Sequence, residues 1–115
     1  MSAIVVITTV GTETEANSLA GELVGRRHAA CVNVLPIHRS VYRWRGKLCE
    51  DSEYMLLIKS VETEYAAIEA AIQELHSYEL PEILRFSVEG GEQTFLNWLA
   101  ESVQKKHVSA RAADD

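Results

Sequence analysis

The chain has 115 residues, 47% of them hydrophobic and 24% charged, which is the size and composition of a single globular domain. Its formal net charge of -6 at pH 7 argues against binding to nucleic acid or an anionic membrane, because no basic surface is available to replace counterions. The apolar run at residues 3–7 is too short to cross a bilayer, so we expect a cytoplasmic protein.

The first elements are a strand and a helix. Residues 3–9 are rich in β-branched side chains, which predicts a buried strand. Thr12 then precedes Glu15 by three residues, the spacing of a capping box at a helix start. Apolar residues follow with helical spacing, at Ala16, Leu19, Ala20, Leu23 and Val24. We expect this helix to end near Arg27.

Residues 30–60 predict a long β-hairpin. Two runs of alternating apolar residues meet at residues 44–47, Trp-Arg-Gly-Lys, a turn sequence. With period two, Leu56 points to one face of the second strand and its neighbours Met55 and Leu57 to the other, so both faces are partly apolar. One small domain cannot cover a ribbon of this length. We therefore expect other copies of the chain to cover it.

The remaining sequence predicts a helix, a strand and a further helix. Thr63 opens the second helix, which should stop where Leu80-Pro81 forces extended geometry. Residues 83–88 predict the last strand, and apolar spacing from Phe95 to Val103 predicts the third helix. Residues 1–103 should thus form a single domain, and residues 104–115 a flexible polar tail.

The predicted order is βαββαβ followed by a C-terminal helix. This is the α+β ferredoxin-like architecture, in which two helices cover one face of a four-stranded antiparallel sheet. If the third helix is too short to cover the other face, sheets of neighbouring subunits must do so. A ring of three is one closed solution.

Residues 76–82, His-Ser-Tyr-Glu-Leu-Pro-Glu, are the best candidate site. His76, Glu79 and Glu82 are candidate metal ligands, because imidazole suits copper and zinc while carboxylates extend the range to harder ions. A structural interpretation is equally open. A histidine beside a helix C-terminus is favoured by the helix dipole alone, and Glu82 then faces solvent.

Other residues suggest an intersubunit cleft rather than chemistry. Trp44 beside the turn either inserts into a neighbouring subunit, which we favour, or stacks on a ligand. Lys59, Tyr65 and Tyr78 are further candidates for this cleft. A phosphate-binding glycine loop and a local nucleophile signature are both missing from the sequence. We therefore expect neither an enzyme nor an organic cofactor.

The two cysteines offer little for a closed metal site or a disulfide. Cys31 and Cys49 fall near opposite ends of the predicted hairpin, too far apart for an intrachain bridge. Cys49 alone supplies too few ligands for a metal, and its pairing between subunits stays open.

Four strings of the sequence carry a resemblance to a known family. They are residues 29–33 (Ala-Ala-Cys-Val-Asn), 40–47 (Ser-Val-Tyr-Arg-Trp-Arg-Gly-Lys), 50–53 (Glu-Asp-Ser-Glu) and 76–83 (His-Ser-Tyr-Glu-Leu-Pro-Glu-Ile). These strings resemble the CutA family of divalent-cation tolerance proteins. With Thr8-Thr9 and Leu96-Asn97-Trp98, the resemblance runs in order from Ile4 to about Val103.

The resemblance implies a cytosolic homotrimer of ferredoxin-like subunits, similar in architecture to the PII signalling proteins. It also implies tolerance to copper and other divalent metals, with copper binding reported for members. His76 matches the family histidine that precedes the Tyr-Glu pair. Some members have a cysteine at the end of the first strand and a second histidine before the first, where this chain has Thr8 and Leu75.

Two functions follow as hypotheses. In the first, the trimer is a metal-binding tolerance protein, and His76 with Glu79 or Glu82 holds a divalent ion, completed from an adjacent subunit. In the second, the trimer is a PII-like binding or scaffold module whose intersubunit cleft takes a small anion or a partner's loop. Lys59 discriminates between them, because its charge repels a metal ion and attracts an anion.

Overall fold

The computed structural model describes residues 2–105. Most of the predicted flexible tail, residues 106–115, therefore lies outside the described residues. The elements are β1 (Ala3–Val10), α1 (Glu13–Gly25), β2 (Cys31–Trp44), β3 (Lys47–Val61), the 3-10 turn η1 (Glu62–Glu64), α2 (Tyr65–Leu75), β4 (Leu84–Ser87) and α3 (Gln93–Ser102). This is the βαββαβ order with a further C-terminal helix that the sequence predicts.

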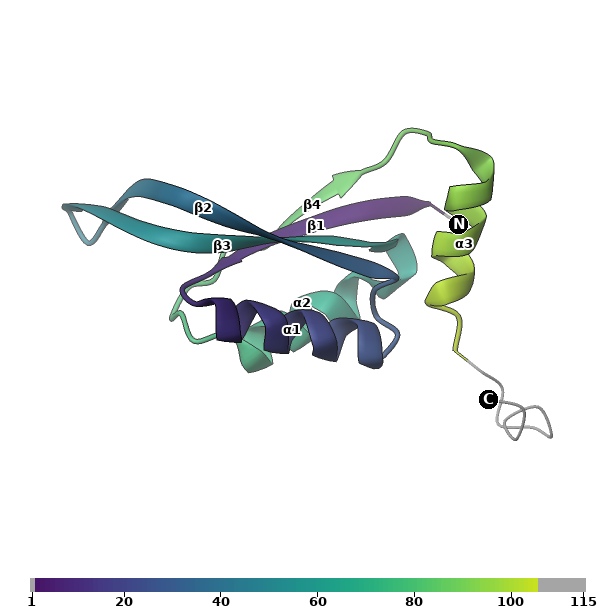
Figure 1. The fold of residues 1–115 in the computed structure, drawn as a ribbon, viewed down its shortest axis with the longest axis horizontal. Coiled ribbons are helices and arrows are strands. Elements are labelled where there is room, and N and C mark those ends of the chain that lie inside the picture. The colour runs from purple at the N-terminus through teal and green to yellow at the C-terminus, as the bar shows by residue number, and fades with distance from the viewer. Residues whose placement is uncertain (1, 106–115) are drawn as a thin grey trace.

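The four strands form one antiparallel sheet in the order β2-β3-β1-β4. Helices α1 and α2 lie side by side on one face of it (Figure 1). Leu56 and Ile58 of β3 are fully buried between the sheet and these helices, with Leu19 and Leu23 of α1. The ferredoxin-like α+β fold is confirmed.

The long hairpin is confirmed, and its turn is a two-residue loop. Trp44 pairs with Lys47, and between them Arg45 and Gly46 have φ of 51 and 80 degrees. Positive φ at both loop residues is the type I′ conformation, which matches the twist of the flanking strands. The hairpin extends well beyond the two helices (Figure 1), with an irregularity in the register between Ile37 and Ser40.

The start of α1 agrees with the prediction, but α2 ends early. Thr12 caps α1, its Oγ1 accepting from the Glu15 N–H at 3.1 Å. The Glu15 carboxylate does not return to the cap and instead accepts from the backbone N–H and the hydroxyl of Ser77, both at 2.9 Å. Helix α2 therefore ends at Leu75, five residues before Leu80-Pro81. His76 has an extended backbone, and the next residue, Ser77, is held by Glu15 of α1.

In the part of the chain that the structure describes, the sheet face opposite α1 and α2 is covered only at one end. There, Leu99 and Val103 pack with Ala3 and Val61 as α3 crosses the end of the sheet (Figure 1). We call the remainder the open face. The strand register places on it Val5, Ile7, Leu35, Met55, Leu57, Leu84 and Phe86.

The open face is strongly apolar for an exposed surface. Leu84 and Phe86 of β4 are 49% and 51% exposed, beside Ile7 and Val5 respectively.

Within residues 2–105, no helix has the length and hydrophobicity needed to span a membrane.

Candidate functional site

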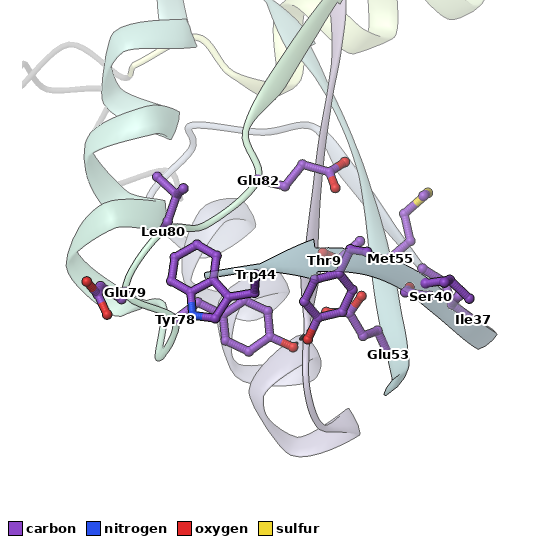
Figure 2. Close-up of a pocket in the computed structure, with 12 residues that line it drawn as sticks. Thr9, Ile37, Ser40, Trp44, Glu53, Met55, Tyr78, Glu79, Leu80 and Glu82 are labelled. Atoms are coloured by element: carbon purple, nitrogen blue, oxygen red, sulfur yellow. Dashed lines mark hydrogen bonds between the residues drawn. The ribbon is translucent and has the colours of Figure 1, made fainter. Parts of the chain in front are cut away.

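The candidate site is a cavity of about 550 Å³ between the hairpin and the loop after α2 (Figure 2). We call it the hairpin pocket. Its lining is mostly apolar and aromatic, with three carboxylates. The residues are Thr9, Ile37, Ser40, Val41, Tyr42, Trp44, Glu53, Met55, Tyr78, Glu79, Leu80 and Glu82.

The strand register explains how these side chains meet. Glu53 and Met55 are two residues apart on β3 and therefore point to the same face, where Met55 pairs with Thr9 of β1. Trp44 comes from the end of β2. Arg45 beside it forms an ion pair with Glu79 at 2.8 Å, which ties the hairpin tip to the loop carrying Tyr78. The pocket is thus an extension of the open face toward the hairpin tip.

Glu53 is the most buried charged group of the pocket, at 7% exposure. Its Oε2 accepts a hydrogen bond from the Tyr78 hydroxyl at 2.6 Å. Among the ion pairs formed by the described residues, none includes Glu53. The carboxylate therefore has a phenol partner but no cation partner.

Two tyrosines beside the pocket are held in their protonated form. Burial, and then the hydrogen bond to Glu53, raises the pKa of Tyr78 well above its ordinary value. The hydrogen bond that Tyr42 donates to Asp51 raises the pKa of Tyr42 to about 12. Both phenols are therefore hydrogen-bond donors at neutral pH and poor nucleophiles.

His76 has a fully buried side chain and is not one of the residues that line the pocket. Its Nε2 lies 2.7 Å from the carbonyl oxygen of Thr9, and the Tyr78 N–H donates to its Nδ1 at 3.0 Å. These partners assign a neutral ring that donates from Nε2 and accepts at Nδ1. His76 therefore holds the loop against β1 in this conformation.

The predicted metal ligands do not form a site within one chain. Both ring nitrogens of His76 are hydrogen-bonded, and Glu79 is paired with Arg45. Glu82 lines the pocket. Residues 2–105 contain no group of three His, Cys, Asp or Glu side chains placed to hold a metal ion. The described residues of a single chain thus do not fit a metal, and metal binding by these three residues stays a prediction.

The four predicted cleft residues lie in three different places. Trp44 and Tyr78 line the hairpin pocket together (Figure 2). Lys59 lies farther along the open face, paired with Val5 and Cys31. Tyr65 begins α2 on the helix side, where its hydroxyl donates to Glu69 at 2.8 Å.

Sequence reasoning missed Glu53 as a site residue. The available signal was its position, because Glu53 has the same alternation as the apolar Met55 and Leu57 of β3. A carboxylate on the apolar face of a strand indicates either that this end of the strand is solvated or that the charge is buried and paired. Only its contact with Tyr78, 25 residues away, decides between the two.

The chain thus has a ferredoxin-like fold with an open sheet face, and the pocket adjoins that face. The sequence model of the CutA1 divalent ion tolerance protein matches residues 4–102, and the chain belongs to this family. It is 39% identical over 98 residues to the divalent-cation tolerance protein CutA of Thermus thermophilus, covering 85% of this chain and 95% of that one.

Further relatives agree in sequence and in structure. The divalent-cation tolerance protein CutA of Pectobacterium atrosepticum is 39% identical over 102 residues, 89% of this chain and 93% of that one. The crystal structure of CutA1 from Oryza sativa superposes with a TM-score of 0.88 at 35% identity, covering 92% of this chain and 97% of that chain.

Proposed function

We propose that this protein acts as a homotrimer in divalent-cation tolerance, the role that the names of its relatives state. The open face is the observation that carries the proposal. Rows of apolar side chains on β1, β3 and β4 lie together there, and residues 2–105 provide no layer that covers them. Contiguous exposed patches of this kind mark association surfaces. Threefold symmetry is what the family resemblance implies, and it closes the assembly.

Paired substitutions test this interface. Leu57→Glu places a charge in the middle of the open face and should lower the mass measured by sedimentation toward that of one chain. Val24→Glu is the matched control, because Val24 is also apolar and 42% exposed but lies on α1. Equal masses for the two variants and the native protein would rule out the open face as the interface.

Metal binding is proposed at the level of the trimer. Since one subunit does not assemble three ligands among its described residues, a bound copper or other divalent ion needs groups from an adjacent subunit. Calorimetric titration with Cu(II) on the native protein and on His76→Ala tests the role of His76. Unchanged stoichiometry and affinity in a folded His76→Ala trimer would remove His76 from the site.

A second function, that of a PII-like ligand-binding module, is favoured by the hairpin pocket. Its volume of about 550 Å³ falls in the range of small-molecule sites, and its few polar groups among apolar walls are typical of them. We propose binding rather than catalysis, because the raised phenol pKa values suit hydrogen-bond donation. Thermal-shift assays with a panel of small metabolites test this proposal. If no metabolite raises the melting temperature of the protein, the proposal is contradicted.

We also propose a cytoplasmic location. Cys31 and Cys49 are free thiols in the described chain, which suits a reducing compartment. Cell fractionation tests the location, and recovery of the protein in an extracytoplasmic fraction would contradict it.

A further inference from the structure

We propose that Lys59 of one subunit forms an ion pair with Glu53 of the next, so that each subunit completes the hairpin pocket of its neighbour. The inference rests on the proposed homotrimer and identifies a pair of charges that its interface joins. Three observations support it. The two charges lie on the same face of the sheet, they are too far apart to meet within one chain, and neither forms an ion pair among residues 2–105.

Glu53 and Lys59 lie on one strand but at opposite ends of the open face. Both belong to β3, and the even spacing between them points their side chains to the same face. At about 3.3 Å per residue, they are separated by about 20 Å along the strand. Two extended side chains cannot bridge this distance, so an ion pair between them has to join two different chains.

The Glu53 end of the interface needs a cation. Glu53 is 7% exposed, and its hydrogen-bond donor Tyr78 is a neutral phenol. A neighbouring subunit that covers the open face removes the remaining contact of this carboxylate with water. A carboxylate buried in this way is destabilised unless it is paired with a cation as well as hydrogen-bonded. The covering subunit is therefore the expected source of the cation.

The Lys59 end of the interface needs an anion for the same reason. Lys59 lies among apolar groups, beside Val5 of β1 and Cys31 of β2, and Val5 in turn pairs with Phe86 of β4. A subunit that covers these apolar groups also removes water from the ammonium group. The lysine is then destabilised unless the neighbouring surface supplies a carboxylate.

The symmetry of a ring brings the two ends together. In a cyclic trimer, each contact joins one surface of a subunit to a different surface of the next. The Lys59 end of one open face can therefore lie against the Glu53 end of its neighbour. Contact between equivalent ends would instead place like charges together, which is unfavourable. Lys47 has the same alternation on β3 but lies exposed at the hairpin tip, where its charge can stay in water.

Neutral substitutions at both positions test the pair. Lys59→Met and Glu53→Gln each keep the approximate size of the side chain and leave one partner buried without its counterion. Each should raise the dissociation constant of the trimer at least about tenfold, seen as a lower urea midpoint in sedimentation of the full-length protein at one fixed subunit concentration. The double variant should lose no more than the weaker single variant, because its second substitution removes a charge that has already lost its partner.

Lys47→Met is the matched control, because it removes the same charge from the same strand at an exposed position. Its urea midpoint should equal that of the native protein. Circular dichroism before the titration establishes that each variant is folded.

Exchanged charges provide a second test of the same pair. Lys59→Glu and Glu53→Lys, made singly, each place two like charges together and should weaken the trimer. The double variant restores opposite charges and should dissociate at a higher urea concentration than either single variant. Such a recovery requires contact between subunits, because the two positions are too far apart within one chain.

The outcomes separate this inference from the proposed trimer. If the native protein is a trimer but the losses from Lys59→Met and Glu53→Gln add in the double variant, the ion pair is wrong and the trimer stands. The ion pair is also wrong if Lys59→Met matches Lys47→Met, or if the exchanged double variant is weaker than both of its single variants. If the native protein sediments as a single chain at micromolar concentration, the trimer and the ion pair are both wrong.

Discussion

Arg45 at the hairpin tip donates from one guanidinium nitrogen to both carboxylate oxygens of Glu79, at 2.8 and 3.0 Å. The two side chains are 68% and 72% exposed, and such surface pairs contribute only about 0.2 to 1 kcal/mol. The importance of the contact is geometric. It holds the end of the hairpin beside the loop after α2, and Trp44 and Tyr78 line the pocket between them.

Arg45 also has an unfavourable backbone conformation, with φ of 51 degrees. Asparagine tolerates this region and a β-branched residue does not. We expect Arg45→Asn to change the free energy of unfolding by less than about 1 kcal/mol and Arg45→Val to lower it by about 1 to 3 kcal/mol. Urea unfolding at one fixed subunit concentration measures both. Equal stability of the two variants would contradict a constraint from backbone conformation.

The two tyrosine–carboxylate pairs should differ in their contribution to stability. Tyr78→Phe leaves Glu53, at 7% exposure, without its hydrogen-bond donor, which should cost about 1 to 3 kcal/mol. Tyr42→Phe is the matched control, because its partner Asp51 is exposed and can turn to water. The Tyr42→Phe variant should therefore lose clearly less stability than Tyr78→Phe. Chemical unfolding compares them, and similar losses would indicate that burial of Glu53 is unimportant.

Alkaline pH should weaken the fold through the same phenols. Their folded pKa values are raised, so the unfolded chain releases these protons first as the pH increases. The contribution to stability is complete below about pH 10, the ordinary tyrosine pKa, and is lost as the pH rises toward the folded values. We expect the urea midpoint to fall above about pH 10, and less steeply in Tyr78→Phe. Parallel pH profiles would show that Tyr78 does not contribute.

Thr8 should be replaceable with a gain in stability. Its side chain is fully buried on β1, and its Oγ1 has no hydrogen-bond partner among residues 2–105. Removing a buried hydroxyl that lacks a partner should stabilise the fold, so Thr8→Val is expected to raise the free energy of unfolding by about 1 kcal/mol. Thermal unfolding measures the change. A destabilised Thr8→Val protein would mean that the hydroxyl is hydrogen-bonded in solution.

The sequence predicts the elements well because their signals are local. Thr12 caps a helix, residues 44–47 form a hairpin turn, and the alternation around Leu56 separates the core face from the open face. The predicted end of α2 is wrong because a tertiary contact determines where this helix ends. Glu15 accepts hydrogen bonds from Ser77, 62 residues away, after His76 has left the helix.

The site was harder to predict for the same reason. The density of polar groups in residues 76–82 predicts a site there, and four of these residues, Tyr78, Glu79, Leu80 and Glu82, line the pocket. The expected neighbours Lys59 and Tyr65 lie elsewhere, on the open face and on the helix side of the sheet. Glu53 becomes a site residue only through Tyr78. Pairings of this kind depend on the fold as a whole and leave no periodic pattern in the sequence.

The central claim is that the open face is the interface between subunits, because both the trimer and any site shared between subunits depend on it. Sedimentation equilibrium of the native protein at micromolar concentration tests it most directly. We predict a single species of three times the 12.8 kDa chain mass. A folded species with the mass of one chain would contradict the account.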